Sequence, residues 1–165
     1  MEKLDYKYKT AQAALKSLHT LIVLIEQDKK TSLHTLTTST NLSEHQLVYR
    51  EALIQRFEYS VDIFGKYLKE FLLIKFGRTQ QPPKSIIREA FAAELIDEEN
   101  TELFMEMIDD RNITSHTYME PLAIKIARHI PAYCIAMQLV LTNNPPPPPA
   151  LKPRRTTQQI KKLRK

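Results

Sequence analysis

Residues 43–77, SEHQLVYREALIQRFEYSVDIFGKYLKEFLLIKFG, decide the fold of this protein. Their apolar side chains recur every three or four residues, which is the pattern of one face of an amphipathic α-helix. They are Ile54, Phe57, Val61, Phe64, Leu68, Phe71 and Ile74. Ser43 and Gln46 have the spacing of a capping box, and Gly77, followed by two prolines, marks a helix end. The stretch therefore predicts one long helix, the longest element of the chain.

Helical patterns of the same kind lie on both sides of this stretch. The predicted helices span residues 5–27, 43–77, 85–95, a segment that begins at 97–99, and 121–141. The Thr- and Ser-rich segment 28–41 is predicted to be a connecting loop, and Pro131 predicts a kink near residues 127–131. Four long helices and one short extra helix indicate an all-α protein, an antiparallel up-and-down four-helix bundle.

The composition favours the same fold class. Only 2 of 165 residues are glycine, which leaves little material for β-hairpins or for Gly-rich phosphate loops. The single cysteine, Cys134, excludes an intramolecular disulfide and a Cys-based zinc site, and it lies on a helical stripe where we expect a core residue. The histidines at 19, 34, 45 and 129 show no His-x3-His spacing. We therefore expect no metal, and the sequence indicates no cofactor.

The chain divides into a helical body, residues 1–142, and a tail, residues 143–165. The tail has five prolines at 145–149 and, from position 150 onward, seven Lys or Arg residues and no acidic residue. Residues 1–149 hold 17 basic and 19 acidic residues, so the body is at −2 while the whole chain is at +5. We expect the tail to be disordered, and any attraction to nucleic acid that follows from net charge belongs to it.

No targeting segment is visible at the N-terminus. The longest strongly apolar run near it, residues 21–25, is too short to cross a bilayer. Together with the cysteine content, this predicts a cytoplasmic protein with no membrane partner.

Residues 109–118, DDRNITSHTY, are the segment that could carry chemistry. Arg111 offers a planar guanidinium group suited to phosphate, and His116 is able to exchange a proton near neutral pH. Cleavage of RNA by its own 2′-hydroxyl needs a base, an acid and a cation that stabilises the pentacoordinate phosphate, and it needs no metal. The segment therefore indicates a candidate ribonuclease site.

The local backbone decides whether Arg111 and His116 meet. In an unbroken helix their side chains point about 140° apart and share no site. The run Thr114, Ser115 and Thr117 favours a bend or a helix restart with a hydroxyl N-cap, which would let them converge. Alternatively, a second copy of the chain could supply the Arg or His that completes the site. The alternative is structural: Arg111 pairs with a carboxylate at a helix end, and His116 caps a helix or packs.

The Arg-x4-His-x-Tyr pattern of residues 111–118, with Asn directly after the Arg, resembles the motif of HEPN-domain proteins. The likeness is greatest to the small HepT-type toxins that are encoded beside a minimal nucleotidyltransferase. Residues 55–60 (QRFEYS) and 87–91 (IREAF) are similar to the same branch, so the resemblance covers about residues 5–142. Two features depart from it: the chain has no tryptophan where the branch has one near position 103, and the basic tail is foreign to the pattern.

The resemblance implies the toxin of a toxin–antitoxin pair, a metal-independent endoribonuclease that acts as a homodimer on an RNA substrate. Arg111 would bind phosphate, His116 would act as acid and base, and Asn112 would orient or polarise the substrate. The cognate nucleotidyltransferase antitoxin would neutralise the toxin by transferring AMP to Tyr118. The alternative, from the early description of the branch, is a non-catalytic substrate-binding partner of a nucleotidyltransferase.

Overall fold

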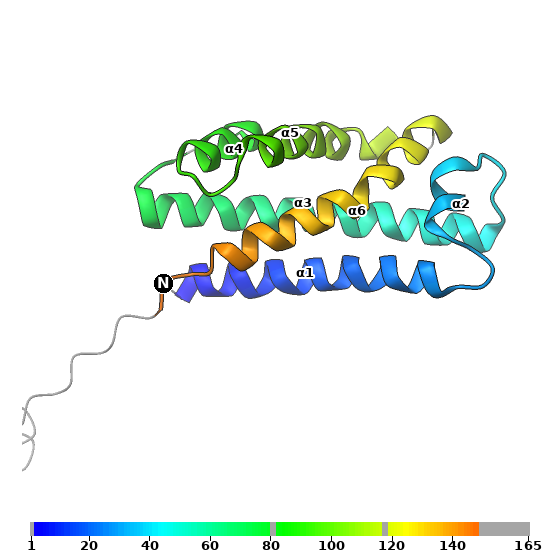
Figure 1. The fold of residues 1–165 in the computed structure, drawn as a ribbon, viewed down its shortest axis with the longest axis horizontal. Helices are drawn as coiled ribbons and strands as arrows, with labels where there is room; N and C mark the ends of the chain where they lie inside the picture. The colour runs from blue at the N-terminus through cyan, green and yellow to red at the C-terminus, as the bar shows by residue number, and fades with distance from the viewer. Residues whose placement is uncertain (1, 80–81, 117–118, 149–165) are drawn as a thin grey trace, which may run out of the picture.

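Six α-helices and one 3₁₀ turn form the part of the chain that the computed structural model describes, residues 2–79, 82–116 and 119–148 (Figure 1). In chain order they are α1 (Glu2–Gln27), α2 (Leu33–Thr38), α3 (Glu44–Phe76), α4 (Pro83–Ala92), α5 (Glu98–Asn112), η1 (Thr114–His116) and α6 (Glu120–Asn143). The four long helices α1, α3, α5 and α6 run in alternating directions (Figure 1). The all-α bundle predicted from the sequence is confirmed, and the described residues contain no strand.

Local signals fix both ends of α3. The Ser43 hydroxyl accepts a hydrogen bond from the Gln46 amide at 3.4 Å, and the Gln46 side chain accepts one from the Ser43 amide at 3.0 Å. At the other end Gly77 has φ 66°, a left-handed conformation that costs little without a Cβ. The capping box and the glycine stop therefore act as the sequence predicts.

The segment 28–41 is not simply a loop, so that prediction was wrong. It contains α2, which begins after Ser32, whose hydroxyl accepts a hydrogen bond from the Thr35 amide at 3.2 Å. Leu36 from this short helix is fully buried. A helix of one or two turns is not stable by itself, so α2 depends on this packing rather than on its own helix propensity.

The core fills the space between the long helices. Phe57, Phe64 and Phe71 of α3 are buried, as their spacing predicts, while Ile74 at the end of the same stripe is 40% exposed. Helix α6 continues through Pro131. Its length and a mean hydropathy of 1.2 over 18 residues would suffice to cross a membrane, but half of that window is buried in the bundle. Core packing therefore accounts for the buried half of its apolar residues, while Ile135 and Leu139 are exposed. The cytoplasmic location stays a prediction.

The predicted boundary between body and tail falls close to the end of α6. The helix extends to Asn143, and the Asn144 side chain donates a hydrogen bond to the Val140 carbonyl at 2.9 Å. Asn144 also accepts a hydrogen bond from the buried Tyr67 hydroxyl. The tail predicted to be disordered spans residues 143–165, of which 149–165 lie outside the described residues. Asn143 belongs to α6, and residues 145–148 have no regular secondary structure.

Candidate functional site

Helix α5 ends directly after the two residues expected to contact a substrate. Its last residues are Arg111 and Asn112, and the 3₁₀ turn η1 follows. The Thr114 hydroxyl donates a hydrogen bond to the Arg111 carbonyl at 2.8 Å. The predicted interruption of the helix is present, but this hydroxyl caps the C-terminus of α5 and not the N-terminus of the next helix. No side chain caps α6, which begins after Met119.

Two carboxylates of α3 hold the Arg111 side chain. Arg111 donates from Nε to Asp62 Oδ1 at 2.9 Å and from Nη2 to Asp62 Oδ2 at 3.0 Å, and Glu58 Oε1 lies 3.4 Å from Nη2. The hydrogen bonds to Asp62 raise the pKa of the guanidinium group, against an opposite effect of partial burial. Arg111 therefore remains charged, in a fixed orientation, with one cation facing two anions.

Arg111 and Asn112 share a cavity of about 410 Å³ between α3, α5 and the start of α4. We call it the cationic cavity, because its lining contributes three cations, Lys66, Lys69 and Arg111, and one anion, Asp62. The other lining residues are Val61, Gly65, Pro83, Ile86, Ile108 and Asn112. The mixture of apolar walls and an excess of cationic lining residues is suited to an anionic group attached to an apolar body.

The other two predicted site residues do not line this cavity. His116 is the last residue of η1 and is exposed to solvent, and its amide donates a backbone hydrogen bond to the Ile113 carbonyl at 2.9 Å. Tyr118, the predicted acceptor of AMP, lies outside the described residues. The structure therefore brings together Arg111 and Asn112, but it does not add His116 to their cavity.

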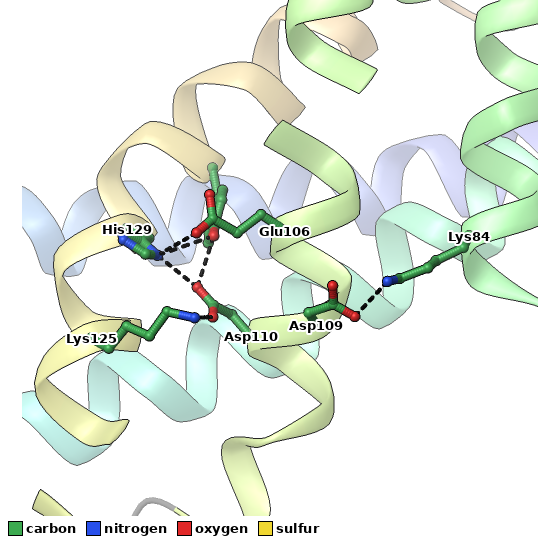
Figure 2. Close-up of polar contacts among 7 residues, drawn as sticks. Lys84, Glu106, Asp109, Asp110, Lys125 and His129 are labelled. Atoms are coloured by element: carbon green, nitrogen blue, oxygen red, sulfur yellow. Dashed lines mark hydrogen bonds and ion pairs between the residues drawn. The ribbon is translucent and has the colours of Figure 1, made fainter. Parts of the chain in front are cut away.

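A polar network that the sequence analysis missed joins the C-terminal part of α5 to α6 (Figure 2). Asp110 is fully buried, and its Oδ2 accepts hydrogen bonds from His129 Nδ1 at 2.7 Å and from the Tyr133 hydroxyl at 2.8 Å. The Lys125 ammonium group lies 3.0 Å from Asp110 Oδ1. Burial alone would raise the pKa of Asp110, but the hydrogen bonds from His129, Lys125 and Tyr133 outweigh it and lower that pKa. Asp110 thus ties α5 to α6 immediately beside Arg111.

The same network brings together a possible metal-ligand set. Ligand atoms of Glu106, Asp110 and His129 all lie within 4.8 Å of one another, and this is the one such group in the described part of the chain. The Lys125 ammonium group already occupies one side of Asp110, and both donors on Oδ2 would have to leave before that oxygen could coordinate a metal. We therefore assign the cluster to structural support and not to metal binding.

The fold and the cavity define the class of this protein as a small all-α bundle with a cationic cavity where α3 meets α5. The chain belongs to the family described as nucleotidyltransferase substrate binding protein like, which matches residues 6–144. This membership confirms the coarse part of the resemblance seen in the sequence, the link to a nucleotidyltransferase.

Two solved structures have similar folds. A protein from Thermus thermophilus is 35% identical, with a TM-score of 0.64 over 82% of this chain and 99% of that chain. The structure of HI0074 from Haemophilus influenzae is described as revealing the fold of a substrate binding domain of a nucleotidyltransferase. It is 24% identical, with a TM-score of 0.64 over 82% of this chain and 96% of its own, and it supports the fold alone. No curated protein matches the sequence.

Proposed function

We propose that this protein is the substrate-binding partner of a nucleotidyltransferase, and that it binds the anionic part of the substrate in the cationic cavity. The observation that supports this most is the composition of the cavity lining, which holds three cations, Lys66, Lys69 and Arg111, and one carboxylate, Asp62. Glu58 lies beside Arg111 as a second anion. A phosphate is the group that such a set of cations recognises best. The family membership supplies the nucleotidyltransferase.

Titration of the full chain with inorganic phosphate, followed by two-dimensional NMR, tests the binding role. Resonances of Lys66 and Asn112 should shift, and Lys66→Ala should weaken binding several-fold. Lys16→Ala is the matched control, because Lys16 is exposed on α1 and does not line the cavity. Size-exclusion chromatography with the cognate nucleotidyltransferase should give one complex peak. Separate elution of the two proteins, or phosphate shifts that map elsewhere, would contradict the proposal.

The second candidate is the metal-independent endoribonuclease, the toxin of a toxin–antitoxin pair. It is favoured by the interruption after Asn112, which removes the helical geometry that would hold Arg111 and His116 about 140° apart. In this reading Arg111 binds the scissile phosphate, His116 transfers protons, Asn112 orients the substrate, and a homodimer forms the cleft. The position of His116 outside the cationic cavity opposes it. The displacement of Asp62 from Arg111 is required in both candidates.

RNA cleavage in the presence of EDTA separates the two candidates. The ribonuclease should cleave without a divalent ion, and Arg111→Ala and His116→Ala should each abolish cleavage while the helical circular dichroism is kept. A wild-type chain that binds the nucleotidyltransferase but cleaves no RNA would leave only the binding role.

The second candidate includes neutralisation of the toxin by transfer of AMP to Tyr118. The negative charge of an adenylate on Tyr118 would repel RNA phosphates from Arg111. Intact-mass analysis after co-expression with the nucleotidyltransferase should show added adenylate that disappears in Tyr118→Phe. The matched control is Tyr59→Phe, because Tyr59 is 55% exposed on α3 and therefore accessible. Adenylate that maps to Tyr59 would contradict the assignment.

A further inference from the structure

A second cavity lies along α3, next to the cationic one. Its volume is about 510 Å³, and we call it the anionic cavity because its lining holds three glutamates and one arginine. The lining residues are Leu47, Arg50, Glu51, Ile54, Gln55, Glu58, Thr114, Glu120 and Ala123. Glu58 pairs with Arg111, and Thr114 caps α5, but neither the motif at 111–118 nor the proposed phosphate site explains the other side chains.

Arg50 and Glu120 leave unmet hydrogen-bonding capacity in this cavity. Arg50 is 4% exposed, and its Nη2 donates to Glu120 Oε2 at 2.7 Å. Arg50 Nη1 and Glu120 Oε1 are both buried and have no hydrogen-bond partner among the described residues. A buried donor or acceptor without a partner costs about 1–3 kcal/mol, and more when the group is charged. The pair therefore keeps one unsatisfied donor, Arg50 Nη1, and one unsatisfied acceptor, Glu120 Oε1, for a ligand that carries the complementary groups.

The anionic cavity adjoins the proposed phosphate site. Glu58 lines the anionic cavity and lies 3.4 Å from Arg111, while Asp62, one helical turn further along α3, lines the cationic cavity. Arg50 lies eight residues before Glu58 on α3, a rise of about 12 Å, which is the scale of one nucleotide from its phosphate to the far edge of its base. A ligand with its phosphate at Arg111 thus has its base within reach of the anionic cavity.

The charge of the anionic cavity selects the kind of group that enters it. One arginine and three glutamates repel a phosphate but accept hydrogen bonds from a neutral group rich in N–H donors. Guanine fits this pattern best among the nucleobases. Its O6 and N7 are acceptors for an arginine, and its N1–H and N2–H₂ are adjacent donors for carboxylates. Ile54, Leu47 and Ala123 supply apolar surface for the ring faces.

We propose that the anionic cavity is a guanine subsite for the substrate whose phosphate binds at Arg111, with O6 accepting from Arg50 and the N–H edge donating to Glu120. The inference rests on the proposed function, because it takes the substrate to be a nucleotide or RNA. A site that binds a base through buried polar groups discriminates strongly against bases that leave those groups unpaired.

Titration of the full chain with guanosine monophosphate and with the adenosine, cytidine and uridine monophosphates, followed by NMR, tests the proposal. Guanosine monophosphate should bind at least tenfold tighter than the other three and should shift resonances at Arg50 and Gln55. Guanosine without phosphate should shift the same resonances, and inorganic phosphate should shift only the cationic cavity. The titration with guanosine therefore reports on the base subsite, and the titration with inorganic phosphate reports on the phosphate site.

Two variants assign the preference to this cavity. Glu120→Gln removes the negative charge and replaces one of the two carboxylate acceptors by an N–H donor, and Glu51→Gln removes the charge of an exposed carboxylate of the lining for which no ion pair with Arg50 is found among the described residues. Each should reduce the guanine preference at least fivefold. Glu44→Gln, an exposed position in the first turn of α3, is the matched control and should keep it. If Glu120→Gln fails to fold, the guanine preference of Glu51→Gln alone tests whether this cavity is responsible.

Four outcomes distinguish the failures. Equal binding of all four nucleotides, or a guanine preference that both variants keep, overturns the guanine subsite and leaves the phosphate site intact. Shifts with phosphate but none with guanosine also overturn it, because the base then does not enter the anionic cavity. No shift with any ligand overturns both the subsite and the proposed phosphate binding.

Discussion

The carboxylate of Asp62 binds one edge of the Arg111 guanidinium group bidentately, with Nε–Oδ1 at 2.9 Å and Nη2–Oδ2 at 3.0 Å. This arrangement has the geometry with which an arginine binds phosphate bidentately. Asp62 therefore occupies the position that a substrate phosphate needs, and substrate binding at Arg111 is an exchange of one anion for another.

Asp62→Asn should raise the affinity of Arg111 for inorganic phosphate. The side chains of Arg111 and Asp62 are 32% and 42% exposed, and an ion pair of this exposure is worth about 1 kcal/mol at most, so the expected gain is up to about fivefold. Phosphate titration by NMR or calorimetry measures it. Asp5→Asn makes the same change in net charge on α1, where Asp5 pairs only with Lys9 among the described contacts, and should have no effect. Weaker phosphate binding in Asp62→Asn would instead show that Asp62 orients Arg111 for its ligand.

Asp110→Asn should destabilise the fold by about 2–4 kcal/mol, because it removes the charged acceptor that His129, Tyr133 and Lys125 share in the interior. Urea denaturation followed by circular dichroism measures the change. Asp109→Asn is a matched control on the same helix, since the Asp109 side chain is 59% exposed and pairs with Lys84 at the surface (Figure 2). We expect a loss below about 1 kcal/mol there. Equal losses in the two variants would contradict the role given to Asp110.

The same carboxylate predicts how stability depends on pH. The folded-state pKa of Asp110 lies below its ordinary value of 3.8, so the unfolded chain takes up this proton first as the pH falls. The stabilisation is therefore complete above pH 3.8 and is lost as the pH decreases through the lowered folded-state value. Urea denaturation at a series of pH values should show a steeper fall in wild type than in Asp110→Asn below about pH 4. If the free energy of unfolding falls equally with pH in the two proteins, Asp110 does not cause the pH dependence.

The sequence predicts those parts of the fold that local signals determine. The capping box at Ser43 and the glycine at Gly77 fix α3, and apolar spacing places the buried face of each long helix. Helix α2 was missed because Leu36 stabilises it through tertiary packing, which leaves no periodic pattern in six residues. Sequence alone therefore suffices where a helix is long enough to show its period.

The site was predicted only in part, because its key contacts join distant residues. The motif singled out Arg111 and Asn112, but Asp62 is 49 residues away from Arg111, and nothing local indicates that pairing. His129 and Tyr133 are four residues apart and so share one face of α6, which was an available signal. The burial of Asp110 depends on how closely α5 packs on α6, and a single sequence does not contain that distance.

Cys134 should be unreactive in the folded protein. Burial raises the pKa of its thiol to about 11, so very little thiolate is present at about pH 8, and the side chain is only 1% exposed. Iodoacetamide at about pH 8 should modify less than about 10% of the native protein in a time that fully modifies it in concentrated urea, as measured by intact mass. Fast modification of the native protein would mean that α6 opens locally or that Cys134 is accessible.

Truncation of the tail should show which C-terminal residues contribute to the stability of the helical bundle. A chain that ends at Pro148 should keep its free energy of unfolding within about 0.5 kcal/mol of the full length, because Pro145–Pro148 form no helix and the hydrogen bonds of Asn144 are retained. A chain that ends at Thr142 should lose about 1–3 kcal/mol, since the buried Tyr67 hydroxyl then lacks its acceptor, the Asn144 carbonyl. Urea denaturation of the three chains measures both differences. A loss above about 1 kcal/mol in the chain that ends at Pro148 would show that residues beyond it pack on the bundle, and the boundary drawn from the proline run would then be wrong.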